Sequence, residues 1–198
     1  MVALGLMKKN VKKPWIIAIL GKTATGKSDL AVLLAKKWDG EVISADSRQI
    51  YRGLDLGTGK ITKREMKGIP HHLLDIADSK KQFSVSEYKN LADKTIGEII
   101  SRGKLPIICG GTGLYIDAVL KNIVVPEVPP NKKLRKELEK KTVPQLFVIL
   151  KKLDSRRAKE IDANNPRRLI RAIEIATALG SIPLLEVSPP KFNVLKTI

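Results

Sequence analysis

Residues 15–28 have the sequence WIIAILGKTATGKS. The apolar run Trp15–Leu20 is short and uninterrupted, which is typical of a strand covered on both faces of a sheet. Gly21–Ser28 follows and matches the pattern G-x-x-x-x-G-K-S/T, and residues 27–38 then carry leucines at helical spacing. The stretch therefore predicts a strand, a phosphate-binding loop and a helix, in that order.

The loop also predicts the chemistry of its site. Glycines let the backbone wrap around a phosphate, and N–H groups at the start of a helix point toward the anion. Lys27 supplies a positive charge, and the Ser28 hydroxyl is a candidate ligand for Mg²⁺. Lys22 is either a further cation beside the anion or a solvated side chain. We predict that the loop binds a polyphosphate or diphosphate through Gly21, Lys22, Thr23, Ala24, Thr25, Gly26, Lys27 and Ser28.

The following segments extend the same pattern. A second strand is predicted at Glu41–Ser44, just before Asp46, and a helix begins with the capping box Ser84–Glu87 and ends at Gly103. Another strand, Leu105–Cys109, leads into the glycine-rich stretch Gly110–Gly113 and a helix. A strand–helix–strand unit implies a right-handed crossover and parallel pairing. The predicted fold class is α/β, a P-loop NTPase-like core whose parallel sheet is flanked by helices.

The pattern changes after residue 120. A proline-rich linker, Val124–Pro130, cannot continue a helix, and three short helical segments are predicted at 132–141, 144–153 and 155–161. A stronger helix follows, with Asn165 as N-cap and Pro166 at its first position. We therefore expect a first part of the core at 1–120, a small basic helical insertion at 121–164, and a return to an incomplete core at 165–198.

Composition narrows the class of protein. The 198 residues include 37 Lys and Arg against 20 Asp and Glu, a net charge of +17, and 15 of these basic residues but only 6 acidic ones lie between 121 and 171. Such an excess favours a polyanionic partner, although a solvated lysine-rich surface is the alternative. The only cysteine, Cys109, excludes an intramolecular disulfide, and no apolar run is long enough to span a membrane. We expect a cytoplasmic monomer with no export signal.

Five ordered motifs carry a resemblance to a known family. The phosphate loop is followed by ISADSRQIYRG at 43–53 with DLGTGK at 55–60, IPHHLLD at 69–75, GGTGLYI at 110–116 and NPRRLIR at 165–171. Together they resemble the tRNA dimethylallyltransferases, also called tRNA isopentenyltransferases, over residues 15–198. Members of that family extend further, so the resemblance implies a chain that is truncated at its C-terminus.

The resemblance implies transfer of a dimethylallyl group from dimethylallyl diphosphate to N6 of an adenine beside the tRNA anticodon. Asp46 would accept a proton from N6, and Thr112 would line the same channel as a second catalytic residue. Diphosphate would occupy the loop where a kinase holds ATP, with Mg²⁺ on Ser28. The insertion at 121–164 would bind tRNA. The anticodon stem-loop would be contacted by Asp46, Ser47, Arg48, Gln49, Thr112, Arg135, Arg167, Arg168, Leu169, Ile170 and Arg171.

Other functions remain open from the residues alone. A small P-loop kinase or an isopentenyltransferase acting on free adenylate would use the same loop, and an inactive RNA-binding fragment would keep the basic surface. Asp46 could be a structural turn residue, and the arginines at 167–171 could form a solvated face. The pair His71–His72 suggests a metal, but no third His or Cys lies at metal-site spacing, so we expect a structural or channel-lining role.

Overall fold

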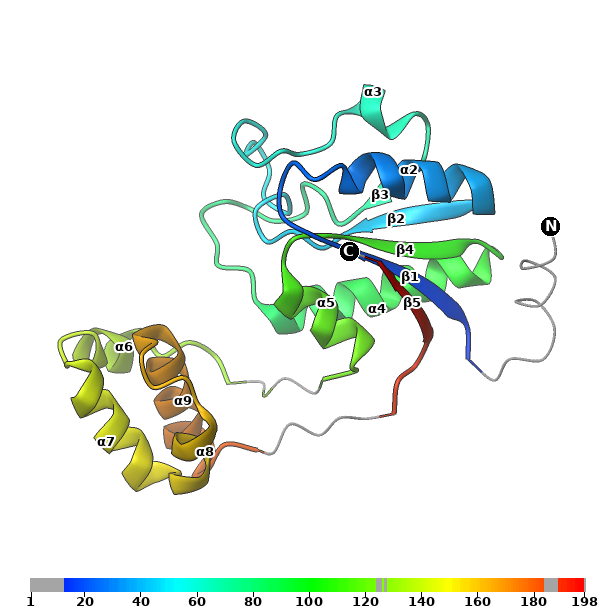
Figure 1. Ribbon diagram of the computed structural model, residues 1–198. Coiled ribbons are helices and arrows are strands. Elements are labelled where there is room, and N and C mark those ends of the chain that lie inside the picture. Colours follow the sequence, from blue (N-terminus) through cyan, green and yellow to red (C-terminus); the bar gives the residue numbers. More distant parts are fainter. Residues whose placement is uncertain (1–12, 124–125, 127, 184–188, 198) are drawn as a thin grey trace. The chain divides into compact units, whose positions relative to one another are not determined.

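The computed structural model describes residues 13–123, 126, 128–183 and 189–197. The chain divides into two compact units, of which the first comprises residues 1–125 and 187–198 and the second residues 126–186 (Figure 1). The basic residues before Lys13 and part of the proline-rich linker predicted at Val124–Pro130 lie outside the described residues.

The first unit is built on a parallel sheet of five strands in the order β3-β2-β4-β1-β5. Strand β1 pairs with β4 from Ile17 opposite Ile107 to Leu20 opposite Gly110. The strands are β1 (Trp15–Leu20), β2 (Gly40–Ser44), β3 (His71–His72), β4 (Leu105–Gly110) and β5 (Asn193–Thr197). Their order confirms the predicted α/β class with a parallel sheet.

Helices cover both faces of this sheet (Figure 1). Helix α2 (Lys27–Trp38) packs on the face that carries Ile17 and Ile19, while α4 (Val85–Ser101) and α5 (Gly113–Leu120) pack on the face that carries Ile16 and Ala18. Side chains of a strand point alternately to the two faces, so one apolar run supplies both cores. The capping box predicted at Ser84 and Glu87 is present at the start of α4.

Two elements were not predicted from the sequence. Helix α3 (Lys63–Met66) is a single turn capped by Thr62 and Glu65, and β3 consists only of His71 and His72. Both are too short for hydrophobic periodicity to reveal them.

The second unit contains four helices in its described residues: α6 (Lys132–Leu138), α7 (Val143–Leu153), α8 (Ser155–Glu160) and α9 (Pro166–Leu179). Leu146 and Leu150 of α7 share a buried cluster with Leu169 and Ile173 of α9. The prediction that the chain returns to the core at residue 165 was therefore wrong. The apolar face of α9 belongs to the helical unit, which runs from 126 to 186.

None of the helices in the described part of the chain combines the length and the apolar character needed to cross a membrane.

Candidate active site

The phosphate loop folds back on itself between β1 and α2. The Thr25 hydroxyl donates to Lys22 O at 2.8 Å, and the Lys27 ammonium donates to the same carbonyl oxygen. Gly26 precedes the helix with a φ of 78°, a left-handed conformation that glycine adopts without strain. The loop thus presents the N-terminus of a twelve-residue helix and two lysines at one end of the sheet.

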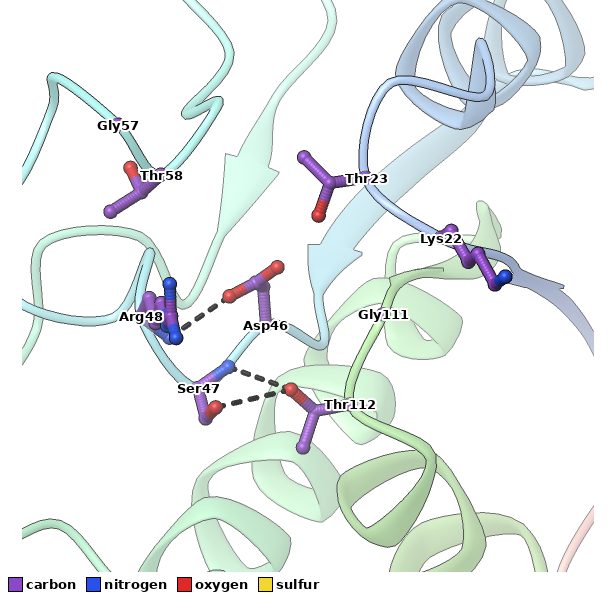
Figure 2. A pocket seen from close by; sticks show the side chains of 9 residues that line it. All are labelled: Lys22, Thr23, Asp46, Ser47, Arg48, Gly57, Thr58, Gly111 and Thr112. Atoms are coloured by element: carbon purple, nitrogen blue, oxygen red, sulfur yellow. Dashed lines mark hydrogen bonds between the residues drawn. The ribbon is translucent and has the colours of Figure 1, made fainter.

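Asp46 lies just beyond the carboxyl end of β2, where parallel α/β sheets bind ligands. Its Oδ1 accepts a hydrogen bond from the Arg48 backbone N–H at 2.9 Å, which orients the carboxylate. The neighbouring Ser47 N–H donates to Thr112 Oγ1 at 2.9 Å, and the Thr112 hydroxyl lies 3.3 Å from Ser47 Oγ (Figure 2). Thr112 therefore fixes the turn that carries Asp46.

Two glycines at the end of β4, Gly110 and Gly111, allow the Asp46 turn to lie close to the backbone of β4. A Cβ at Gly110 would lie 2.2 Å from the Ala45 carbonyl oxygen, so no larger residue fits without moving backbone. A Cβ at Gly111 would lie 3.4 Å from Gly21 O and 3.9 Å from Asp46 Oδ2. The Gly110–Gly111 pair thus brings the phosphate loop and the Asp46 turn together.

Four segments enclose a pocket of about 410 Å³ (Figure 2). Its walls come from the phosphate loop, the turn after β2, the turn after β4 and a loop at 57–58. The lining residues are Lys22, Thr23, Asp46, Ser47, Arg48, Gly57, Thr58, Gly111 and Thr112. Two residues of the predicted phosphate-binding loop and a carboxylate therefore face the same space.

Two stacked tyrosines support the pocket from within the core. The buried Tyr88 hydroxyl donates to Ser44 O at 3.1 Å, at the last residue of β2. Its ring stacks on Tyr115, with centroids 4.1 Å apart. Burial raises the pKa of Tyr88 and raises that of Tyr115 to about 12, so both phenols stay neutral. They act as structural supports of the β2 end.

The predicted site residues of the first unit fall into three groups. Lys22, Thr23, Asp46, Ser47, Arg48 and Thr112 line the pocket together, whereas Gly21 and Ala24–Ser28 complete the loop beside it. Gln49 is turned to the neighbouring loop, where its amide nitrogen lies 3.3 Å from Thr58 O and 3.1 Å from Gly59 O. The pocket-lining role of Gly57 and Thr58 was missed, although the motif DLGTGK at 55–60 contained both residues.

In the helical unit, two of the predicted tRNA-binding arginines are engaged by a buried acid. The Glu174 side chain, 1% exposed, accepts from Arg135 Nη2 at 2.8 Å, Arg171 Nη1 at 2.6 Å and the Asn131 backbone N–H at 2.6 Å. Burial alone would raise the pKa of Glu174, but these hydrogen bonds outweigh it and lower the pKa to about 2. The same ion pair raises the pKa of Arg135.

The remaining members of that segment differ in exposure. Arg167 is exposed, and Arg168, 66% exposed in its side chain, lies 3.8 Å from Asp162. Ile170 is half-buried against the helical core. Leu169 is 0% exposed and its side chain packs in that core, as its apolar character predicts, so its predicted contact with tRNA stays a prediction that only its backbone could meet.

The two histidines take part in local contacts. His72 Nε2 lies 2.6 Å from the buried carboxylate of Glu41, which also pairs with Arg102 at 2.8 Å, and His71 Nδ1 lies 2.8 Å from Ile69 O. Burial lowers the pKa of His71. Among the described residues, no three His, Cys, Asp or Glu side chains form a cluster that could hold a metal ion.

Comparison with known proteins gives a consistent result. The model of the IPP transferase family matches residues 49–195. A tRNA dimethylallyltransferase from Leuconostoc citreum is 48% identical over 161 residues, which are 81% of this chain and 55% of that protein. The chain thus spans about half the length of the curated relatives it matches.

Solved structures agree with the sequence relatives. A full-length tRNA isopentenylpyrophosphate transferase from Bacillus halodurans is 43% identical, with a TM-score of 0.59 over 91% of this chain and 58% of its own. A eukaryotic dimethylallyltransferase acting on tRNA is 29% identical, with a TM-score of 0.74 over 92% of this chain and 47% of its own. These neighbours confirm the P-loop NTPase-like fold class, and the chain belongs to the IPP transferase family.

Proposed function

We propose that this chain carries the donor and acceptor sites of a tRNA dimethylallyltransferase, which moves a dimethylallyl group from dimethylallyl diphosphate to N6 of an adenine beside the tRNA anticodon. One observation carries the proposal: the pocket is lined both by Lys22 and Thr23 of the phosphate loop and by Asp46 and Thr112. A transferase of this kind needs a leaving diphosphate and a proton acceptor on either side of one reacting carbon.

On the donor side, the loop amides and Lys27 would bind the diphosphate at the N-terminus of α2. The Ser28 hydroxyl is a hard oxygen ligand of the kind that Mg²⁺ prefers, and it would hold the ion together with phosphate oxygens and water. The ion would neutralise part of the charge of the leaving diphosphate. Lys22 lines the pocket and adds a second cation beside the anion.

On the acceptor side, the adenine would leave the stack of the anticodon loop to enter the pocket. The N6 lone pair attacks C1 of the allyl group, the C1–O bond breaks, and the diphosphate leaves with the bonding electrons. Asp46 takes the proton that N6 loses. Ser47, Arg48, Gln49 and Thr112 would orient the base. The Arg48 N–H also holds the Asp46 carboxylate, and Thr112 holds the turn at Ser47.

The tRNA backbone would lie on the basic helical unit. Of the predicted tRNA-binding arginines, Arg167 and Arg168 are best suited to phosphates, because both are exposed. Arg135 and Arg171 keep donors on their guanidinium groups and would add contacts, but they also hold Glu174. Ile170 would add an apolar contact to tRNA at the edge of this surface. With tRNA as its substrate, the protein would act in the cytoplasm, as a monomer.

Labelled dimethylallyl diphosphate with tRNA or AMP as acceptor tests this function. We expect label in tRNA and none in AMP. Label in AMP instead would show an adenylate isopentenyltransferase. Salt-sensitive tRNA binding with no transfer to either acceptor would show an RNA-binding protein and contradict the proposal, as would phosphate transfer from ATP, the reaction of a P-loop kinase.

A further inference from the structure

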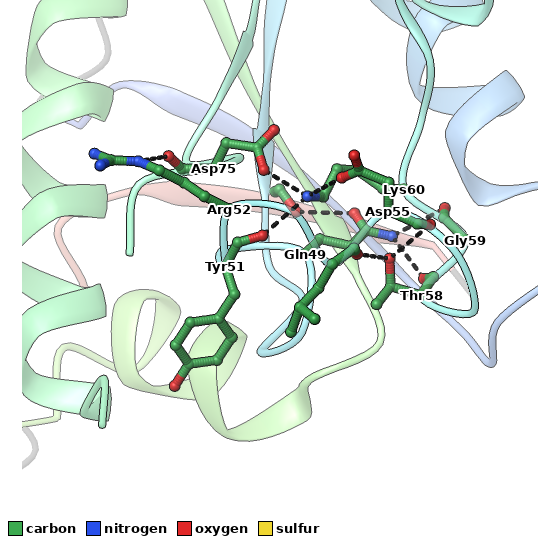
Figure 3. A network of polar contacts seen from close by, with 10 residues as sticks. Gln49, Tyr51, Arg52, Asp55, Thr58, Gly59, Lys60 and Asp75 are labelled. Atoms are coloured by element: carbon green, nitrogen blue, oxygen red, sulfur yellow. Dashed lines mark hydrogen bonds and ion pairs between the residues drawn. The ribbon is translucent and has the colours of Figure 1, made fainter. Parts of the chain in front are cut away.

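One buried lysine outside the pocket joins three separate turns. The Lys60 side chain is only 6% exposed, and its ammonium donates to Tyr51 O at 3.0 Å, Asp55 Oδ1 at 2.6 Å and Asp75 Oδ1 at 2.5 Å (Figure 3). An ammonium has three N–H donors, so this set uses all of them. Burial acts to lower the pKa of Lys60, but the two carboxylates outweigh it and raise the pKa, so the group stays charged.

The loop that Lys60 closes has few other means of support. Residues 54–59 form no helix or strand, and Gly57 and Gly59 have positive φ values of 79° and 62°. Thr58 Oγ1 donates to Leu54 O at 2.7 Å, and Gln49 donates to the two carbonyls at its far end. Lys60 and Gln49 therefore hold this loop from one side (Figure 3).

The other side of the loop is the wall of the pocket. Gly57 and Thr58 line it opposite Thr23, with Asp46 between them (Figure 2). A Cβ at Gly59 would lie 3.4 Å from Thr23 Cγ2, so the loop also reaches the phosphate loop. The Lys60 side chain is not among the lining residues. It can therefore influence the pocket only through the segments that it holds, at Tyr51, Asp55 and Asp75.

We propose, on the basis of the transferase function proposed above, that Lys60 is a positioning residue for the acceptor: its bonds to Tyr51, Asp55 and Asp75 fix the loop at 54–59 as the wall against which the adenine lies beside Asp46. The donor site does not depend on this wall, because the phosphate loop forms its own hydrogen bonds at Lys22, Thr25 and Lys27. Lys60 thus governs catalysis with the acceptor and leaves binding of the donor unchanged.

The variant Lys60→Met separates these two effects, because it keeps the apolar stem and removes the charge. We expect the Kd for inorganic diphosphate to stay within about twofold of wild type, while kcat/KM for tRNA falls by about 10²-fold, the cost of a misplaced reacting group. The diphosphate titration also gives the number of binding-competent sites in each preparation. Simple loss of folded protein would lower that count and kcat but leave the KM for tRNA unchanged.

Lys89→Met is the matched control. Lys89 is also largely covered, 13% exposed, and pairs with Asp93 at 2.8 Å on α4, but it does not line the pocket. We expect wild-type transfer from it. If Lys60→Met lowers the count of folded sites severely, Asp55→Asn gives a milder test. Asp55 is 68% exposed, and the variant retains Lys60 with its bonds to Tyr51 and Asp75. It should shift the same parameter in the same direction.

The outcomes separate the two proposals. No transfer to tRNA by the wild-type chain contradicts the proposed function itself. Wild-type transfer with an unchanged kcat/KM for tRNA in Lys60→Met, per active site, contradicts the positioning role. Equal loss of diphosphate affinity and acceptor catalysis also contradicts it, because Lys60 would then support the whole pocket.

Discussion

The Lys27 ammonium lies inside the phosphate loop, where it donates to Lys22 O and is 3.5 Å from the Thr25 hydroxyl oxygen. In Lys27→Ala the loop loses the cation that offsets the charge of the diphosphate. We expect most of the affinity for dimethylallyl diphosphate to be lost in a calorimetric titration. Lys36→Ala, an exposed lysine in the last turn of the same helix, is the control and should bind normally. Normal donor affinity in Lys27→Ala would show that the loop does not hold the donor.

Residues encoded by a short motif could be predicted from the sequence. The phosphate loop and Asp46 each lie next to an apolar strand that fixes their place at the sheet edge, so local patterns sufficed. The partners of Lys60 could not be predicted, because Tyr51, Asp55 and Asp75 meet only through tertiary structure. Glu174 shows the same limit: nothing local indicated that a buried acid would engage Arg135 and Arg171.

At the element scale, the ends of β2 and β4 approach each other closely at Gly110 and Ala45. In Gly110→Ala the new Cβ would lie 2.2 Å from Ala45 O, and relieving that clash must move backbone at the end of β2. We expect the free energy of unfolding to fall by about 3 kcal/mol, measured by urea denaturation. Gly97→Ala in α4, with nothing within 4 Å of the new Cβ, should instead stabilise the protein by about 0.5–1 kcal/mol. Wild-type stability in Gly110→Ala would show that β2 and β4 can move apart at this point without loss of stability, and that glycine is not required there.

Glu174 makes the stability of the helical unit depend on pH. Its pKa in the folded protein, about 2, lies below the ordinary value of 4.5, so its contribution is complete above about 4.5 and is lost as the pH falls toward 2. We expect Glu174→Gln to cost about 3 kcal/mol near neutral pH, because two partly buried arginines lose their partner. The difference from wild type should shrink as the pH falls.

Urea denaturation followed by circular dichroism at several pH values measures this effect. Glu160→Gln is the control, since Glu160 is 56% exposed and its pair with Arg157 is long, at 3.7 Å. A wild-type pH profile in Glu174→Gln would show that the arginines do not depend on this carboxylate.

The extent of α9 illustrates why elements are easier to predict than their grouping. Asn165 and Pro166 indicated the start of this helix correctly. Its assignment to the core failed because an apolar stripe specifies that a face is buried but does not specify which partner buries it. Leu146 and Leu150 of α7 form that partner.

For the whole molecule, the net charge of +17 predicts salt-dependent binding of tRNA. Arg167→Ala combined with Arg168→Ala should weaken binding and reduce the slope of log K against log salt by about one unit per lost phosphate contact. Diphosphate affinity and stability should remain near wild type. Filter binding over a range of salt concentrations measures the slope, and Lys94→Ala, an exposed lysine on α4, is the control. An unchanged slope would show that Arg167 and Arg168 belong to a solvated surface and do not contact tRNA phosphates.

The central claim is that one pocket holds the leaving diphosphate and the carboxylate that takes the proton from the acceptor. Asp46→Asn tests it most directly, because asparagine keeps the oxygen that accepts from the Arg48 N–H but cannot take a proton. In a single-turnover assay with saturating donor and tRNA, we predict a transfer rate lower by about 10²–10⁴-fold, the usual contribution of a general base, with unchanged donor affinity. Transfer at the wild-type rate, with chemistry rate-limiting, would contradict the claim and leave Asp46 as a turn residue.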